Sequence, residues 1–248
     1  MTPTSGGEVI HLSGLEYAIA LAAVTVGALV QGSVGFGANI VAVPVIAVLE
    51  PDALPATLAL VVIPLVAIMA VRERHAVDRP GVTWVTVGRV PGTVVGASVI
   101  AVISADTLSV LLGAGVLLAV AMSTLTASIP VNRVTATTAG FASGAMGTAT
   151  SIGGPPLALL YQHHEGPVLR ATLAVAFAVG TVLSLVGLAV AGAIEPWHVV
   201  LAIALLPGLV AGLALSRLLV DRLDRAWLRP AVLVFAAATA VVAIVRGL

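Results

Sequence analysis

The chain has 248 residues, of which 60% are hydrophobic and only 9% are charged, and its mean hydropathy is +1.17. A soluble domain carries roughly 25% charged residues, so this composition excludes a soluble globular protein and predicts an integral membrane protein. The 11 basic and 11 acidic residues balance, which leaves no net field to attract nucleic acid. The absence of cysteine excludes disulfides, thiolate metal sites and cysteine catalysis.

The apolar segments, taken in chain order, predict an all-α fold. Residues 1–14 are expected to form a short exposed tail. A helix needs about 20 apolar residues to cross the hydrocarbon core. The run 15–49 is too long for one span and contains a glycine-rich break, so it predicts a hairpin of two segments, 15–31 and 36–49. The remaining predicted segments are 53–71, 82–104, 107–129, 134–149, a short piece ending at Tyr161, 171–192, 196–219 and 228–245.

The two halves of the chain resemble each other. Glycines and prolines recur in the same order at a nearly constant shift (144 − 32 = 112 near the breaks, 207 − 91 = 116 farther on). The matched pairs are Gly32 with Gly144, Gly35 with Gly147, Pro44 with Pro156, and Pro91 with Pro207. Each half, 15–129 and 134–245, is then a glycine-broken, re-entrant-like hairpin followed by three transmembrane helices.

Arginine placement predicts that the second half is inverted relative to the first. In the first half the charged loop is 72–79, between the second and third elements. In the second half the arginines follow the third element, at Arg217, Arg222, Arg225 and Arg229. Loops rich in arginine stay in the cytoplasm, so corresponding loops face opposite sides, as in many secondary transporters. Both termini are then predicted outside.

The two breaks are the predicted substrate site. Irregular backbone at membrane depth is tolerated only where it is buried in protein or lines a wet cavity. A short helix begins after each break, at Phe36 and at Pro155, and the unpaired amides of a helix N-terminus attract anions. The breaks carry neutral donors and no carboxylates, which favours a small oxyanion over a metal ion. Alternatively, small residues merely allow tight packing, the interpretation we prefer for Gly27, Gly88 and Gly113.

Arg89 is the other informative residue. It lies seven residues into segment 82–104, about 10 Å from the predicted cytoplasmic end at ~1.5 Å per residue. A charge at depth is costly and indicates function, although a long side chain also reaches back to the headgroups. The predicted substrate-binding residues are Gln31, Ser33, Gly35, Phe36, Gly37, Asn39, Arg89, Thr148, Thr150, Ser151, Gly153 and Gly154.

At these breaks the sequence resembles the sulfite exporter TauE/SafE family of bacterial membrane permeases. The residues that carry the resemblance are 31–37 with Pro44, 144–147 and 153–156, and the likeness extends over about 15–245. The first break reads Gly35-Phe36-Gly37, where many members have a run of glycines. The resemblance implies transport of sulfite or small organosulfonates across the bacterial cytoplasmic membrane.

The sequence therefore predicts a secondary transporter, not an enzyme, that binds a small anion between the two hairpin tips and moves it by alternating access. No cofactor, metal or nucleic acid is expected. The expected partners are the anionic substrate and the lipid bilayer, and the oligomeric state stays open, a homodimer included. A passive anion channel with the same site is one alternative. An intramembrane serine hydrolase using Ser143 and His198 is a remote one, because His198 maps to the outer surface and no acid is placed to orient it.

Overall fold

The computed structural model describes residues 12–219 and 225–247, and helices are the only regular structure within these residues. The elements in chain order are α1 (Gly14–Val34), α2 (Ala38–Leu49), η1 (Pro51–Ala53), α3 (Ala56–Glu73), η2 (Arg74–Ala76), α4 (Arg79–Val102), α5 (Ala105–Thr124), α6 (Arg133–Thr150), α7 (Gly154–Tyr161), α8 (Gly166–Val190), α9 (Pro196–Leu219) and α10 (Arg225–Gly247).

These boundaries confirm the predicted all-α membrane architecture. The segments predicted at 15–31 and 36–49 correspond to α1 and α2, and the later segments correspond in order to α3 through α10. Within the described residues, six helices are long and apolar enough to cross a membrane: α1, α3 with η2, α4, α5, α8 and α9. Because helices satisfy all their backbone hydrogen bonds internally, this is the construction of a multi-pass membrane protein.

Capping side chains explain where several helices begin. The Asn132 side-chain oxygen accepts hydrogen bonds from the backbone amides of Val134 and Thr135, at 2.9 and 3.0 Å. Asp78 accepts one from the amide of Gly81 at 3.1 Å. Asparagine and aspartate are favoured at this position because the first amides of a helix have no acceptor within the helix. These caps fix the starts of α6 and α4, which carry residues of the central site.

Each predicted hairpin consists of one long and one short helix. At ~1.5 Å per residue, the 21 residues of α1 and the 18 of α6 extend about 31 and 27 Å. The 12 residues of α2 and the 8 of α7 extend only about 18 and 12 Å. A hydrocarbon core is about 30 Å thick. Neither short helix is therefore long enough to cross such a core alone.

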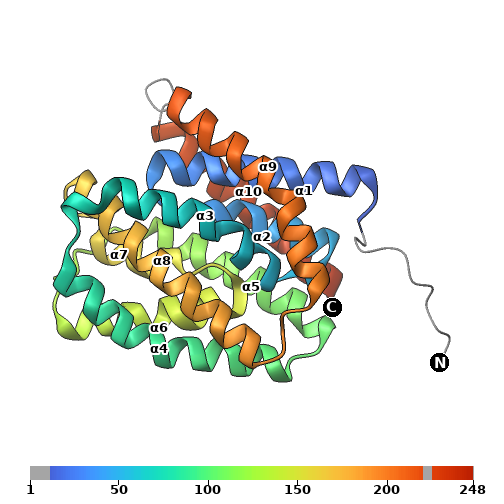
Figure 1. Cartoon of the computed structure of the whole chain (residues 1–248), viewed down its shortest axis with the longest axis horizontal. Coiled ribbons are helices and arrows are strands. Elements are labelled where there is room, and N and C mark those ends of the chain that lie inside the picture. Colours follow the sequence, from blue (N-terminus) through green and yellow to red (C-terminus); the bar gives the residue numbers. More distant parts are fainter. Residues whose placement is uncertain (1–11, 220–224, 248) are drawn as a thin grey trace.

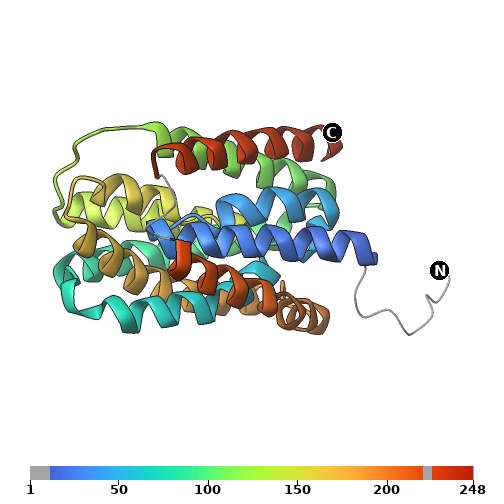
Figure 2. The ribbon, with the colours of Figure 1, turned by 90° about the horizontal axis from the view of Figure 1, so that it is seen from above.

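The helices run roughly along one direction and divide their connections between two ends. In Figures 1 and 2, α1 begins and α10 ends at the same end of the molecule. The connections from α3 to α4 and from α7 to α8 lie at the opposite end. The charged segment 72–79 is part of the first of these connections, so it is separated from the start of α1 by the length of the helices.

The helices of the two predicted halves correspond in order, α1–α5 with α6–α10, and most contacts of one helix are matched by a contact of its counterpart. Helix α4 packs against α6, and its counterpart α9 packs against α1. Likewise, α4 contacts α8 while α9 contacts α3, and α2 contacts α10 while α7 contacts α5. Helices α3 and α8 pack against each other, as do α5 and α10. The pattern of these contacts is therefore symmetric with respect to the two predicted halves.

Glycines bring the backbones of these partner helices together. A Cβ atom on three of the α4 glycines would collide with α6 backbone, and one on either α9 glycine would collide with α1 backbone; these glycines are Gly88, Gly92, Gly96, Gly208 and Gly212. Close approach through small residues is how membrane helices gain packing energy. The packing interpretation of Gly88 is confirmed. It is also confirmed for Gly27, which faces the Ala38 carbonyl, and for Gly113, which faces α10.

The structure aligns the two breaks at a different residue shift from the one found by matching glycines in the sequence. Gly35 ends α1 with φ 100°, and Ser151 ends α6 with φ 59°, so both adopt the left-handed conformation. Gly37 and Gly153 then precede α2 and α7. The breaks are related by a shift of 116 residues (151 − 35 and 153 − 37). The shift of 112 that matches Gly35 with Gly147 is therefore wrong by about one helical turn.

Candidate functional site

The two breaks meet at one cavity of about 60 Å³. The first break contributes Gln31, Gly37 and Asn39, and the second contributes Ser151, Gly153 and Gly154. The surrounding helices add Arg89 from α4, Gly147 from α6, Phe177, Thr181 and Ser184 from α8, and an apolar wall of Ile40, Ala59, Val62, Val66 and Ile152. None of the lining residues is acidic. The cavity thus joins polar groups from both halves of the chain.

Side-chain hydrogen bonds hold the first break in shape. The backbone amide of Gly35 donates to the Gln31 carbonyl at 2.8 Å, which closes α1. The Gln31 side-chain oxygen accepts a hydrogen bond from the Ala38 amide at 3.1 Å, so this buried glutamine caps the start of α2. The Asn39 side-chain amide donates to the Ser151 carbonyl at 2.7 Å. That bond joins the first break directly to the second.

The second break places the start of α7 at the cavity. The Ser151 hydroxyl donates to the Pro55 carbonyl at 2.8 Å, which anchors the break to the start of α3. No side chain caps the start of α7 at Gly153. The amides at the start of a helix lack acceptors within it, and the next residue after Gly154 is Pro155, which has no amide hydrogen. Gly153 and Gly154 therefore offer the amide groups that an anion would meet here.

Arg89 is buried beside these amides. The residue is only 4% exposed, and its Nη1 donates a hydrogen bond to the Ser143 hydroxyl at 2.7 Å. The Ser143 hydroxyl in turn donates to the Gly153 carbonyl at 2.6 Å, which ties the guanidinium to the second break. Arg89 Nε is buried without a hydrogen-bond partner among the described residues. A guanidinium has five N–H groups, and only the bond to Ser143 is found among the described residues, so this lining side chain keeps donors for an acceptor oxygen.

Two glycines make room for the guanidinium. A Cβ atom on Gly180 would overlap with Cζ of Arg89. A Cβ atom on Gly147 would lie 3.1 Å from its Nη2. The arginine therefore occupies a niche between α6 and α8 that side chains at these positions would fill. The side chain of Arg89 thus lies buried in this niche and bonds to Ser143, instead of extending to an exposed position as the headgroup alternative requires.

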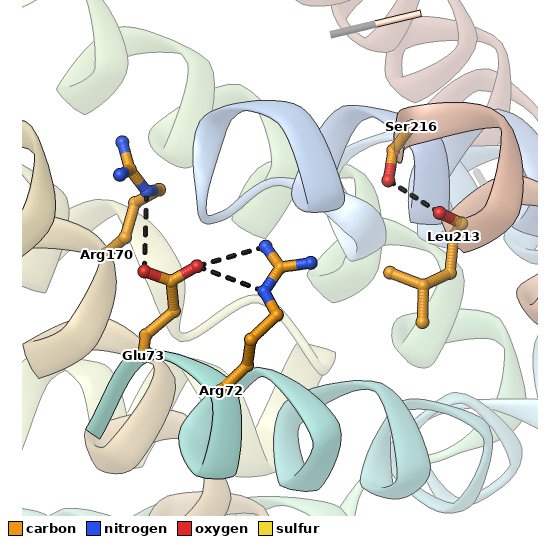
Figure 3. Close-up of polar contacts among 5 residues, drawn as sticks. All are labelled: Arg72, Glu73, Arg170, Leu213 and Ser216. Atoms are coloured by element: carbon orange, nitrogen blue, oxygen red, sulfur yellow. Dashed lines mark hydrogen bonds and ion pairs between the residues drawn. The ribbon is translucent and has the colours of Figure 1, made fainter. Parts of the chain in front are cut away.

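Arg89 has no carboxylate partner in the described part of the chain. The ion pairs found there join Glu73, at the end of α3, to Arg72 at 3.0 Å and to Arg170 of α8 at 3.9 Å (Figure 3). The cavity contains no acidic residue. A buried charge is costly unless it is paired. The chemistry of the cavity therefore favours an anionic ligand.

Seven of the twelve predicted site residues line the cavity: Gln31, Gly37, Asn39, Arg89, Ser151, Gly153 and Gly154. The other five, Ser33, Gly35, Phe36, Thr148 and Thr150, are not part of its lining. Ser33 and Thr150 donate to carbonyls of their own helices, at Leu29 and Met146.

The remaining three lie close by. The Thr148 hydroxyl is 2.8 Å from the Ser184 hydroxyl, behind the cavity wall. Gly35 packs against Arg170, where a Cβ atom would lie 3.0 Å from its Cγ. Phe36 lines a neighbouring space of about 130 Å³ instead.

The sequence reasoning did not place Thr181, Ser184 or Ser143 at the site. Thr181 and Ser184 are three residues apart in α8 and line the cavity together. Residues three apart share a helix face, so two hydroxyls at this spacing in an apolar helix were an available signal. Ser143 had been considered only as the nucleophile of a hydrolase. Its hydroxyl is instead bonded to Arg89 and Gly153, and no histidine contact is found there among the described residues.

His198 lies elsewhere, at the start of α9. Its Nδ1 accepts a hydrogen bond from the Glu195 amide at 2.9 Å, and its Nε2 is 2.9 Å from the Asp52 carbonyl. A serine nucleophile needs a base within hydrogen-bond reach. The described residues therefore do not form the Ser143–His198 pair that the hydrolase hypothesis requires.

A protein-family model described as sulfite exporter TauE/SafE matches residues 19–243. The chain belongs to the sulfite exporter TauE/SafE family. The match contains both breaks, Arg89 and the complete lining of the cavity. Together with the six helices long and apolar enough to cross a membrane, it identifies the chain as a multi-pass membrane protein of a transporter family for sulfite- and sulfonate-type anions. Comparisons with curated proteins and with solved structures gave no match.

Proposed function

We propose that this TauE/SafE protein is a secondary transporter that binds sulfite or a small organosulfonate in the central cavity and moves it by alternating access. The observation that carries the proposal is Arg89. Its guanidinium is buried, has no carboxylate partner among the described residues, and lines a cavity where two helix starts meet. Each of these features favours a negative charge in the same place.

The donors of the cavity suit a compact sulfur oxyanion. The donors available are the guanidinium of Arg89, the amides of Gly153 and Gly154 at the second break, and the side-chain amide of Asn39 at the first break. A cavity of about 60 Å³ has room for about four water-sized groups, since one water needs roughly 10–15 Å³. Sulfite has four heavy atoms. A sulfonate would direct its three oxygens to the donors and its carbon toward the apolar wall.

The membrane orientation is part of the proposal. The halves 15–129 and 134–245 would form an inverted repeat, which the exchange of helix partners supports. The end that carries the charged segment 72–79 would face the cytoplasm by the positive-inside rule. Both termini would then lie on the outer side of the cytoplasmic membrane. The arginines at 222, 225 and 229 belong to the same prediction, but their side chains lie outside the described residues.

Packing defines which parts would move against each other. Gly92 of α4 contacts the backbone of α6, and Gly212 of α9 contacts the backbone of α1. Each long hairpin helix is thus joined closely to a helix from the other half of the chain. We therefore expect the moving bodies to be α4 with α6 and α9 with α1, rather than the two sequence halves. The cavity lies between them, lined by Arg89 on one side and Gln31 on the other.

Ligand binding and flux test the proposal together. In a thermal-shift screen of the purified protein against sulfite, ethanesulfonate, sulfate and acetate, we expect sulfite or the sulfonate to raise the melting temperature most, because a ligand of the native state stabilises it. Uptake of the same anion into reconstituted vesicles should saturate. Protein-free vesicles are the control. Absence of any thermal shift and any protein-dependent flux would refute the function, whereas flux linear in concentration would indicate a channel.

A further inference from the structure

Arg89 is the one ionisable side chain among the described residues that line the cavity. A carboxylate or histidine is therefore missing from the lining residues, so the site has no group of its own that takes up or releases a proton to balance the guanidinium. Within the described residues no cluster of three or more His, Asp or Glu side chains is placed to hold a metal ion. The charge of Arg89 is therefore balanced from outside the chain, and an anion is the species with the required sign.

This imbalance has a consequence for the transport cycle. Alternating access passes through a closed state in which water is excluded from the site. Closing around the guanidinium without a counter-charge leaves a desolvated cation, whose cost is several kcal/mol even after relaxation. Closing around an anion pairs the charge and supplies an acceptor for the guanidinium, whose one hydrogen bond to a described residue goes to Ser143. The loaded protein therefore crosses the closed state more easily than the unloaded protein.

We infer that this protein is an anion exchanger, in which one small anion must bind on the far side before the site returns. The inference rests on the proposed function and deepens it by defining the coupling. The anion that returns need not be the one that left: it has to be small enough for the cavity and to present an oxyanion to Arg89. A second sulfur oxyanion or another small organic anion meets both conditions. Bulky anions do not fit.

The wild-type protein tests this directly. Vesicles are loaded with radiolabelled sulfite and diluted into medium that contains either unlabelled sulfite or gluconate, an anion too large for the cavity. Potassium and valinomycin hold the membrane potential at zero, so that charge build-up does not slow net efflux. We expect efflux into sulfite to be at least tenfold faster than efflux into gluconate. A smaller ratio overturns the exchange mechanism.

The outcomes separate the exchange mechanism from the proposed function. Saturable sulfite flux of equal rate into both media would leave the transporter intact and refute exchange. Absence of sulfite binding and flux would refute both. In Arg89→Gln the site is neutral, so any remaining efflux should lose its dependence on external sulfite and the ratio should fall to about one. In Arg72→Ala, whose exposed side chain pairs with Glu73 away from the cavity, the ratio should stay at the wild-type value. A high ratio in Arg89→Gln would also overturn the inference.

Discussion

Helices α4 and α9 occupy matching positions in the two halves, but their buried faces differ. Both pack through glycines against the long helix of a hairpin. At the shift of 116 residues, Arg89 of α4 corresponds to Leu205 of α9 (205 − 89), and Thr93 corresponds to Leu209 (209 − 93). Both leucines are buried. The same structural position carries a cation in one half and an apolar side chain in the other.

The hairpins show the same difference. Ser143 of α6 bonds to Arg89, whereas its counterpart in α1 at this shift is Gly27 (143 − 27 = 116), which packs against the Ala38 carbonyl. Glycine packing is therefore common to both halves, because both require closely packed helices. Arg89 and Ser143 come from different halves of the chain, but both belong to the closely packed pair α4 with α6, whereas the pair α9 with α1 carries Leu205 and Gly27 at the matching positions. We conclude that the fold accounts for the paired breaks, and that the anion site is an asymmetric addition to it.

The substitution with the largest expected effect is Arg89→Leu, which gives α4 the same residue that α9 carries at the matching position, Leu205. Loss of one partner from a buried charge pair costs about 2–5 kcal/mol, so sulfite affinity and flux should fall at least about thirtyfold. Stability should not fall, since replacing a buried charge by an apolar side chain is often neutral or stabilising. Flux into vesicles and the melting temperature measure the two effects. The expected combination is lost transport in a folded protein.

The matched control for this substitution is Arg72→Ala. Arg72 is an arginine at the end of α3 that pairs with Glu73 and does not line the cavity. Exposed ion pairs contribute only about 0–1 kcal/mol, so its transport should stay within a few-fold of wild type. Equal losses in Arg89→Leu and Arg72→Ala would remove Arg89 from the site and would make the difference between α4 and α9 irrelevant to transport.

A smaller change sharpens the comparison without removing the charge. In Gly180→Ala the new methyl group would overlap with the guanidinium, so Arg89 must move and its bond to Ser143 must lengthen. We expect sulfite affinity to fall about tenfold, which corresponds to ~1.4 kcal/mol. Helix propensity favours alanine over glycine, so α8 should still form. Val179 is the neighbouring residue and lies on the exposed side of α8, so Val179→Ala should retain wild-type affinity. A similar loss of affinity in both variants would contradict the role of Gly180 in making room for Arg89.

Much of this arrangement could be predicted from sequence because it depends on strong, local signals. Long apolar runs and glycine breaks identify helices and irregular segments almost without reference to packing. A charge deep in a span, such as Arg89, stands out for the same reason. Those signals were sufficient to predict that residues of both breaks, Asn39 and Ser151 among them, share one site, and these two are hydrogen-bonded.

The hydroxyl groups could not be assigned in this way. Ser33 and Thr150 look the same in sequence as Thr181 and Ser184, yet the first two bond to their own helices and the second two line the cavity. Serine and threonine bond readily to the carbonyl four residues earlier, and only the packing decides whether that happens. The alignment of the breaks failed for a related reason. Glycines also occur every four residues for helix packing, so a match displaced by one turn looks equally good.

The smallest expected effect tests this distinction between hydroxyls. The Ser33 hydroxyl donates to the Leu29 carbonyl at 2.9 Å and does not line the cavity. Ser33→Ala should therefore change sulfite flux by less than about twofold. Removal of such a bond lowers folding stability by about 1 kcal/mol, and it removes no contact with the substrate. Valine has nearly the same shape as threonine, so Thr181→Val removes only the hydroxyl of a residue that lines the cavity. Its half-saturation concentration for sulfite should rise several-fold. The reverse order, with the larger loss in Ser33→Ala, would mean that the substrate lies against the Ser33 face of α1 rather than between α4 and α8, and the asymmetry between the helix pairs α4 with α6 and α9 with α1 would then have the opposite sense.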